Sequence, residues 1–381
     1  MSTETLRAPA GAIPFFAAER EFAAHERDLL ERISAVLRGG QTLQGEQVSR
    51  FEEELARRVG RAHAVALGSG TDALFFALRA LGIGPGDEVL VPALSFIASA
   101  SCIVRAGARP VFVDVDERYL LDLDSARDAV SARTRAVIAV DLFGQTPDPR
   151  RLDEFARRHE LAVIEDAAQA LGAAHAGAIG AVSCFSFDPT KPLAAAGSGG
   201  ALLTDTAELA ARVRRLRWHG RDASGRYAEL GYNSQLPEVS AAVLRHKLER
   251  EPAWRAARQR IAARYGAALA AVSAIQAPEH DDDATHAFSK YVIRSGDRDL
   301  LRERLARAGV PTRIHYARPL HREPLFAGAQ AAADAGAPTC PNAERIACEV
   351  LSLPIHAFLH EHEVDQVVAA LSLAAGGTAR G

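Results

Sequence analysis

Two segments decide the fold of this chain: Ile164-Glu165-Asp166-Ala167-Ala168-Gln169 and, further along, Cys184-Phe185-Ser186-Phe187-Asp188-Pro189-Thr190-Lys191. The first continues an apolar run, so Asp166 is expected at the carboxyl end of a buried strand, where ligands bind in open α/β sheets. Lys191 adds a primary amine. A lysine that forms a Schiff base and a carboxylate that keeps a pyridine nitrogen protonated are the two groups that pyridoxal phosphate (PLP) requires. The two segments therefore predict a PLP-dependent enzyme.

A candidate phosphate site precedes them in the sequence. The turn Gly68-Ser69-Gly70-Thr71 separates a short apolar strand from an apolar helix, and such a junction presents free N–H groups to an anion. Ser186 alternates with two phenylalanines, so on a strand it faces the cofactor while they enter the core. Each feature also has a structural explanation: a tight turn, an acidic N-cap at Asp166 for a following helix, and an exposed charge at Lys191.

Short apolar runs alternate with helical patterns through the first two thirds of the chain. The expected strands are Ala64–Leu67, Glu88–Val91, Pro110–Val113, Ala136–Val140, Leu161–Ile164 and Ser183–Phe187, and the expected helices include Glu46–Val59, Thr71–Leu81 and Arg151–His159. Continuous apolar strands between helices predict an α/β fold with a mostly parallel sheet that is buried on both faces.

The pattern changes after Glu251-Pro252, where we expect the domain boundary. Residues 1–250 would form a large domain and residues 251–381 a smaller α+β domain, with roughly the first 20 residues free to pack on the smaller one. The expected elements are a helix over Trp254–Leu269, an acidic loop at Asp281–Asp283, strands Lys290–Arg294 and Thr312–His315, and helices Leu300–Ala308, Ala343–Val350 and Val364–Leu373. An Ala/Gly-rich segment at Ala327–Ala337 is expected to be a mobile loop.

Composition excludes several classes of protein. A net charge of −3 and a pI near 6.5 give no basic field for nucleic acid or for an anionic membrane. The apolar, uncharged run Val89–Val104 contains Pro92 and is shorter than the roughly 20 residues of a spanning helix. Four cysteines without metal-type spacing are expected to be thiols in the cytoplasm, and no metal site is expected.

The sequence resembles the DegT/StrS-type sugar aminotransferases, which are PLP enzymes of fold type I. The segments that carry the resemblance are Gly70-Thr71-Asp72-Ala73-Leu74, Gly84-Pro85-Gly86-Asp87-Glu88-Val89, Gly107-Ala108-Arg109-Pro110-Val111, Phe143-Gly144-Gln145, Glu165-Asp166-Ala167-Ala168-Gln169-Ala170, Phe185-Ser186-Phe187, Thr190-Lys191, Arg217-Trp218-His219-Gly220, Gly231-Tyr232-Asn233, His315-Tyr316 and Leu353-Pro354. Their order and spacing run through most of the chain. The resemblance implies a seven-stranded, mostly parallel sheet flanked by helices.

The resemblance also implies roles for individual residues. Lys191 would bond to PLP, Asp166 would pair with the pyridine nitrogen, and Gln169 would contact the ring oxygen. The other implied positions are Phe96, which would stack on the ring; Gly70, Thr71 and Ser186, which would hold the phosphate; Asn233, which would reach the phosphate of a partner subunit in a homodimer; and His315, Tyr316, His321 and Gln235 on the substrate side.

Two departures from the family concern the wall of the pocket. Gln235 stands where the family often has arginine, and Pro192 follows the lysine where the family usually has asparagine. The first removes a fixed charge from the edge of the site, so substrate recognition is expected to differ there.

The implied activity is a ping-pong transamination. An amino acid, most often glutamate in the family, would convert PLP to pyridoxamine phosphate (PMP), and a keto sugar, usually linked to a nucleotide, would then accept the amino group. The alternatives are a keto-cyclitol acceptor, a PLP-dependent sugar dehydratase or lyase, and a PLP-binding regulator without turnover. Dehydratases of this family can carry histidine at the lysine position, and the chain has no DNA-binding signature.

Overall fold

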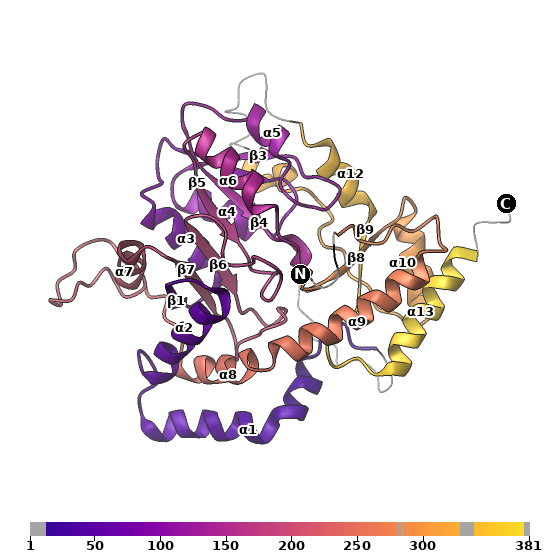
Figure 1. Ribbon diagram of the computed structural model, residues 1–381, viewed down its shortest axis with the longest axis horizontal. Helices are drawn as coiled ribbons and strands as arrows, with labels where there is room; N and C mark the ends of the chain where they lie inside the picture. Colours follow the sequence, from indigo (N-terminus) through magenta and orange to yellow (C-terminus); the bar gives the residue numbers. More distant parts are fainter. Residues whose placement is uncertain (1–12, 281, 283–284, 328–338, 377–381) are drawn as a thin grey trace.

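The computed structural model describes residues 13–280, 282, 285–327 and 339–376, and a seven-stranded sheet lies at its centre (Figure 1). The strands are β1 (His63–Leu67), β2 (Glu88–Pro92), β3 (Arg109–Val113), β4 (Thr134–Val140), β5 (Ala162–Asp166), β6 (Val182–Ser186) and β7 (Gly200–Thr204). Their order is β1-β7-β6-β5-β4-β2-β3. Strands β2 to β6 pair in parallel, whereas β7 is antiparallel to both β1 and β6. The mostly parallel sheet that the sequence predicts is therefore confirmed.

Helices cover both faces of this sheet. They are α2 (Glu46–Val59), α3 (Gly70–Ala80), α4 (Ala98–Arg105), α5 (Leu123–Asp128), α6 (Pro149–Arg158), α7 (Ala207–Leu216) and α8 (Glu238–Leu248), with the short 3₁₀ turn η1 (Leu142–Gly144) after β4. Helices α3, α4 and α7 pack on one face, and α2, α5, α6 and α8 lie over the other. In α2 the apolar side chains of Val48, Phe51 and Leu55 recur every three or four residues and are all buried, which is the spacing of one helix face.

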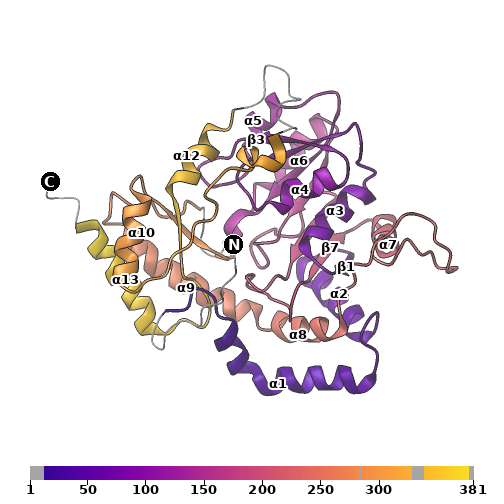
Figure 2. The same cartoon turned by 180° about the vertical axis from the view of Figure 1, so that it is seen from behind.

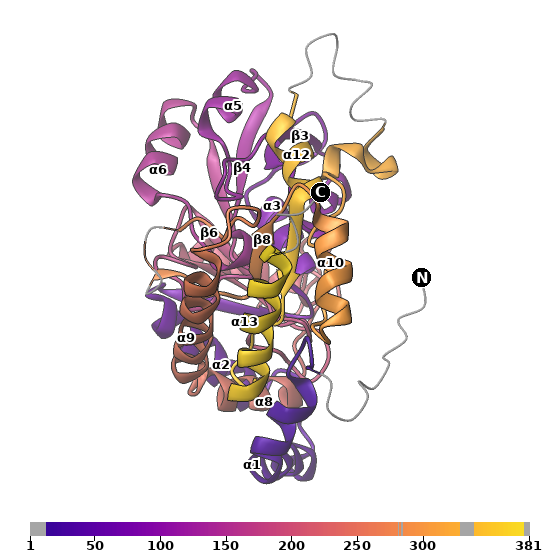
Figure 3. The ribbon, with the colours of Figure 1, turned by 90° about the vertical axis from the view of Figure 1, so that its right-hand side faces the viewer.

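A smaller α+β unit follows α8 and lies to the right in Figure 1. It contains α9 (Glu251–Leu269), β8 (Tyr291–Arg294), α10 (Arg298–Arg307), the 3₁₀ turns η3 (Leu320–Arg322) and η4 (Pro324–Phe326), α12 (Pro341–Glu349), β9 (Val350–Leu353) and α13 (Glu361–Gly376). Strands β8 and β9 pair antiparallel, and α9, α10 and α13 pack around them, as the side view in Figure 3 shows. A domain division at residue 251 stays a prediction.

The N-terminal helix α1 (Ala18–Gly39) was not expected from the sequence. It packs along α8 and is seen from both sides at the bottom of Figures 1 and 2. At its start, Arg20 forms a bidentate ion pair with Glu363 of α13, with both N···O distances 2.7 Å. The Pro14 carbonyl accepts a hydrogen bond from His356 at 3.0 Å. The beginning of the described chain is thus tied to its C-terminal part.

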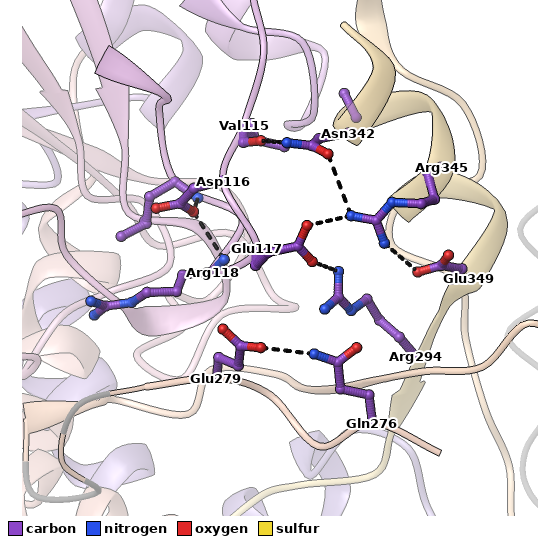
Figure 4. Close-up of polar contacts among 12 residues, drawn as sticks. Val115, Asp116, Glu117, Arg118, Gln276, Glu279, Arg294, Asn342, Arg345 and Glu349 are labelled. Carbon is purple, nitrogen blue, oxygen red and sulfur yellow. Dashed lines mark hydrogen bonds and ion pairs between the residues drawn. The ribbon is translucent and has the colours of Figure 1, made fainter. Parts of the chain in front are cut away.

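A polar junction joins the large sheet to the smaller unit (Figure 4). Glu117, which follows β3, forms ion pairs with Arg294 at 2.6 Å and with Arg345 of α12. The Asn342 amide donates to the Val115 carbonyl at 3.1 Å. These contacts cross between segments that are more than 170 residues apart in the chain, so they fix how the two units sit against each other.

Some expected elements are wrong or were missed. The expected strand Thr312–His315 is wrong: within it only Arg313 pairs, through an isolated bridge to Ser352 of β9. The helix considered after Asp166 is wrong as well, since turns follow β5. Strands β7 and β9 were not predicted. The expected loop Ala327–Ala337 lies almost entirely outside the described residues, as does most of Asp281–Asp283.

Among the described helices, none is both long and apolar enough to cross a membrane. The two longest of these helices, α1 and α9, carry charged residues along their length, which a spanning helix does not tolerate.

We expect Asp114→Ala to lower the free energy of unfolding by about 1–3 kcal/mol, because the buried Asp114 carboxylate accepts the Asn342 and Ala343 N–H groups at 2.9 and 2.8 Å at the start of α12. Urea unfolding followed by circular dichroism measures the change. The control is Asp153→Ala, which removes an exposed ion pair with Arg157 and should cost at most about 0.5 kcal/mol. Equal losses in the two variants would contradict this role.

Candidate active site

Asp166 is a buried carboxylate at the carboxyl end of β5, with a side chain that is 5% exposed. Its Oδ2 accepts a hydrogen bond from Ser99 Oγ of α4 at 2.6 Å, and its Oδ1 accepts from the Ala168 N–H at 3.3 Å. Burial raises the pKa of Asp166, while the Ser99 hydrogen bond and the charge of Lys191 oppose that rise. The position combines a desolvated carboxylate with one strong donor and one nearby cation.

Two more buried carboxyl groups lie near Asp166: Glu165 on β5 and Asp141 directly after β4. Glu165 accepts hydrogen bonds from the Gly177 and Ile179 N–H groups at 2.8 and 3.0 Å and from Ser183 Oγ at 2.6 Å. Asp141 is fully buried, and burial together with the charge of Glu165 raises its pKa well above the ordinary value. Among the described residues no other group donates to its oxygens, so we infer that Asp141 is protonated and donates to Glu165.

Lys191 lies in the turn after β6 and reaches the interior. Its N–H donates to the Asp188 carbonyl at 2.9 Å, and Thr190 donates twice to the Asp188 carboxylate, which fixes the turn. Burial lowers the pKa of Lys191, and the charges of Asp166 and Asp188 raise it. Lys191 also lines a cavity of about 320 Å³ between the turn, α1, α8, α9 and residues 353–358. Its amine is therefore desolvated and accessible from a cavity.

The N-terminus of α3 and the end of β6 meet in a close contact. A Cβ atom at Gly70 would come within 2.6 Å of the Ser186 Cβ, so only glycine fits there. Ser69 caps the helix by accepting from the Asp72 N–H at 3.1 Å. The first-turn N–H groups, including that of Thr71, and the Ser186 hydroxyl consequently gather at one point. This is the geometry of an anion site at a helix N-terminus.

Three predicted residues from separate segments come together beside Asp166. Gln169 Oε1 accepts from the Phe143 N–H at 3.2 Å, and Gln169 Nε2 donates to the Tyr316 hydroxyl at 3.3 Å. The ring of Tyr316 lies 6.2 Å from that of Phe96, centroid to centroid. Phe96 is 49% exposed although it is a large apolar side chain, so its ring is free to stack on a planar ligand.

The two predicted histidines occupy different environments. His315 Nδ1 lies 2.8 Å from Ser352 Oγ, and burial with the charges of Lys290, Arg313 and Lys191 lowers its pKa to about 3, so the ring is neutral. His321 Nε2 pairs with Glu344 at 3.0 Å instead. Neither histidine lines the cavity of Lys191, but the charge of Lys191 acts on His315, so His315 is the better placed of the two.

Asn233 and Gln235 lie together at the surface. Gln235 Nε2 donates to Asn233 Oδ1 at 3.1 Å, and Gln44 donates to Gln235. Asn233 is exposed. Within this subunit neither side chain lines the cavity of Lys191. Their predicted contacts with a partner subunit and with substrate stay predictions.

The arrangement fits PLP. The close contact of Gly70 with Ser186 leaves a helix N-terminus open for a phosphate. Asp166 is buried with only one strong donor, and it is within electrostatic range of the amine that would bond to the cofactor. Phe96 offers an uncovered ring. The roles of these residues toward the cofactor stay predictions, but phosphate, ring and aldehyde each have a suitable partner here.

Sequence reasoning missed three residues that support Asp166. Ser99 and Ser95 are hydrogen-bonded to each other at 2.8 Å, and the four-residue spacing around Phe96 was a signal for one helical face. Asp141 had a weaker signal, an acidic residue directly after an apolar strand. Its partner Glu165 lies on the neighbouring strand, so the pairing depends on the sheet register.

The model of the DegT/DnrJ/EryC1/StrS aminotransferase family matches residues 24–372 of the chain. The UDP-N-acetyl-3-dehydro-alpha-D-glucosamine 3-aminotransferase of Acidithiobacillus ferrooxidans is 39% identical over 93% of this chain and 96% of its own length. The UDP-2-acetamido-2-deoxy-3-oxo-D-glucuronate aminotransferase of Pseudomonas aeruginosa is 37% identical over 89% and 94%. Both relatives match over nearly their full length.

Solved structures agree with the fold. The crystal structure of S. venezuelae DesV in complex with a ketimine intermediate superposes with a TM-score of 0.91 at 38% identity and covers 96% of this chain and 98% of that one. Other solved structures of similar fold contain PMP or PLP. The α/β architecture is thus that of PLP aminotransferases of fold type I.

We expect Asp141→Asn to stabilise the protein at pH 8 relative to wild type. A raised pKa means that folded Asp141 holds a proton that the unfolded chain releases above about pH 4. Its contribution is thus favourable at lower pH and is lost as the pH rises toward the folded-state pKa. The side-chain amide of asparagine can donate to Glu165 and does not titrate, so the variant keeps this stability as the pH rises. Melting temperatures between pH 5 and 9 measure the gap, which should widen with pH; a gap independent of pH would argue that Asp141 is ionised.

Proposed function

The chain belongs to the DegT/DnrJ/EryC1/StrS aminotransferase family, and from that premise we propose that it moves an amino group from an amino acid, with glutamate as the first candidate, to a keto sugar carried on a nucleotide. It is a PLP-dependent aminotransferase. The observation that carries the proposal is the buried Asp166 carboxylate, held by Ser99 at 2.6 Å, within electrostatic range of the desolvated Lys191 amine.

Bound PLP would supply an aldehyde carbon that condenses with an amine, releasing its oxygen as water, and a ring that withdraws electrons from that carbon. Asp166, oriented by Ser99 at 2.6 Å, would hold a proton at the pyridine nitrogen. Gly70, Thr71 and Ser186 would bind the phosphate, Phe96 would cover the ring, and Gln169 would donate to the ring oxygen. These six residues would fix the cofactor's position without involving Lys191.

Lys191 is the group that moves protons. Burial lowers its pKa, which favours the neutral amine that a general base requires. The amine would take the α-proton of the donor and return it at the cofactor carbon, and it would act in the opposite direction on the sugar. The presence of lysine here argues against the dehydratase alternative.

The acceptor is proposed from the relatives. The two relatives described above act, by their names, on UDP-linked 3-keto sugars, one neutral and one with a carboxylate. His315 and Tyr316 border the same region as Gln169 and Lys191, so they are the proposed sugar-side residues. A keto-cyclitol would need the same hydroxyl contacts but no nucleotide.

We also propose a homodimer in the cytoplasm. Asn233 is exposed, and the neighbouring loop carries Tyr227 and Leu230 with 75% and 74% of their side chains exposed. Large apolar side chains at that exposure support an interface. The loop and α7 project to the left in Figure 1. All four cysteines are free thiols, which supports a reducing compartment.

The first test is an absorbance spectrum of the PLP-loaded protein before and after glutamate is added. Wild type should convert to the PMP spectrum. Lys191→Ala should slow this conversion by about 100- to 10,000-fold, because it removes the acid–base group. Asp166→Asn should lower kcat by about 100-fold with little change in KM, since it acts on charge that develops during the reaction.

The outcomes separate the alternatives. Wild type that binds PLP but never converts with any amino acid would refute transamination. Conversion by Lys191→Ala at the wild-type rate would refute the role of the lysine. For Asp166→Asn, an increase in KM at unchanged kcat would mean that the carboxylate binds substrate instead.

A further inference from the structure

The chain uses lysine at only three positions, Lys191, Lys247 and Lys290, among 45 basic residues. All three line the same cavity of about 320 Å³. Every other basic position is arginine. Arginine and lysine differ because lysine is a compact amine whose pKa responds to burial, whereas arginine stays charged. Three lysines on one cavity therefore indicate that the cavity needs amines, and each requires an explanation.

Two of the three lysines are explained by what they contact. Lys191 is the proposed acid–base group. Lys247 of α8 forms an ion pair with Glu21 of α1 and donates to the Ala194 carbonyl at 2.8 Å, so it joins α1 to the turn that follows Lys191. Its charge is neutralised within the fold.

Lys290 has no such partner. Its side chain is 8% exposed, and among the described residues neither a carboxylate nor a carbonyl accepts a hydrogen bond from its Nζ. Only its N–H is engaged, with the Phe143 carbonyl at 3.3 Å. Burial and the nearby charges of Lys191 and Arg313 lower the pKa of Lys290 to about 7, while Asp188 opposes them. A buried amine without a partner costs stability unless a ligand completes it.

The other residues that line the cavity limit which class of ligand can bind there. Its walls are largely aromatic and aliphatic, with Phe15, Phe16, Trp254 and Phe358 among them, and the carboxylate of Glu21 is taken by Lys247. The group left without a partner is the Lys290 amine, and an anion beside it would favour its protonated form. A ligand with an anionic group and a short apolar body matches a cavity of this size and lining.

We propose that Lys290 is the anion anchor of this active site and binds a carboxylate of a substrate whose reacting carbon lies at Lys191. This deepens the proposed function and rests on it. The carboxylate has two possible sources, the amino donor or an acidic keto sugar, and both place the same group on the same amine. In either case the ligand carboxylate forms with Lys290 the charge-assisted hydrogen bond that no described residue provides.

Calorimetric titration of the PLP-loaded protein with unreactive probes tests the anchor without turnover. Glutarate represents the donor because it carries two carboxylates and no amine. UDP-glucuronate and UDP-glucose represent acidic and neutral acceptors. The variants are Lys290→Met, which keeps length but removes charge, Lys290→Arg, which restores charge, and Arg318→Gln, which removes an exposed cation from the segment after Tyr316.

We expect Lys290→Met to weaken glutarate binding by about 10- to 100-fold, the value of one charge-assisted hydrogen bond. Lys290→Arg should recover most of this loss, and Arg318→Gln should bind like wild type. If UDP-glucuronate weakens instead, with UDP-glucose unchanged, the carboxylate belongs to the acceptor. PLP absorbance should be the same in all variants, which also shows that they are folded.

Two results would overturn the anchor. One is equal affinity of wild type and Lys290→Met for both acidic probes, including the case in which neither probe binds. The other is loss of bound PLP in Lys290→Met with normal PLP in Lys290→Arg, because Lys290 would then hold the cofactor. Failure of glutamate to convert wild type would refute the proposed transamination separately, since none of these titrations depends on turnover.

Discussion

The burial of the Asp166 charge at the end of β5 is the constraint on which the site depends. A carboxylate loses its hydration there, and its pKa rises unless donors and cations replace the water. Ser99 supplies the donor at 2.6 Å and Lys191 supplies the positive charge. Both residues lie on segments that pack near β5 only when the sheet has formed. The charge environment of Asp166 therefore depends on the order of the strands.

The other buried ionisable groups near Asp166 must likewise be neutralised or paired, and each does so in a different way. Asp141 keeps its proton and so avoids adding a third buried negative charge beside Glu165 and Asp166. Lys247 is neutralised by Glu21. Within the described part of the chain the Lys290 amine has neither a hydrogen-bond nor an ion-pair partner, which separates it from Lys247. Lys247, which pairs with Glu21, links parts of the fold to each other. Lys290, which has no such pair, is available to bind a ligand.

The accuracy of the sequence predictions follows the strength of each local signal. Six strands of the large sheet, strand β8 and the helix Glu46–Val59 were found because short apolar runs and regular spacing are present in the chain itself. β7 begins directly after a glycine run and is held by antiparallel pairing between β1 and β6. The segment Thr312–His315 has strand-like residues, but only Arg313 pairs, through an isolated bridge to Ser352 of β9. Pairing of this kind cannot be read from one segment.

The sequence alone determined the chemistry of the site: a lysine and a carboxylate in the right order, a glycine-rich turn before an apolar helix, and the absence of a basic field. These depend on residue type and on neighbours within a few positions. The tertiary structure decided which groups meet. It joins Ser99 to Asp166 across 67 residues and Gln169 to Tyr316 across 147, and it gathers all three lysines on one cavity. Burial and charge depend on distances through space, which only the packed fold sets.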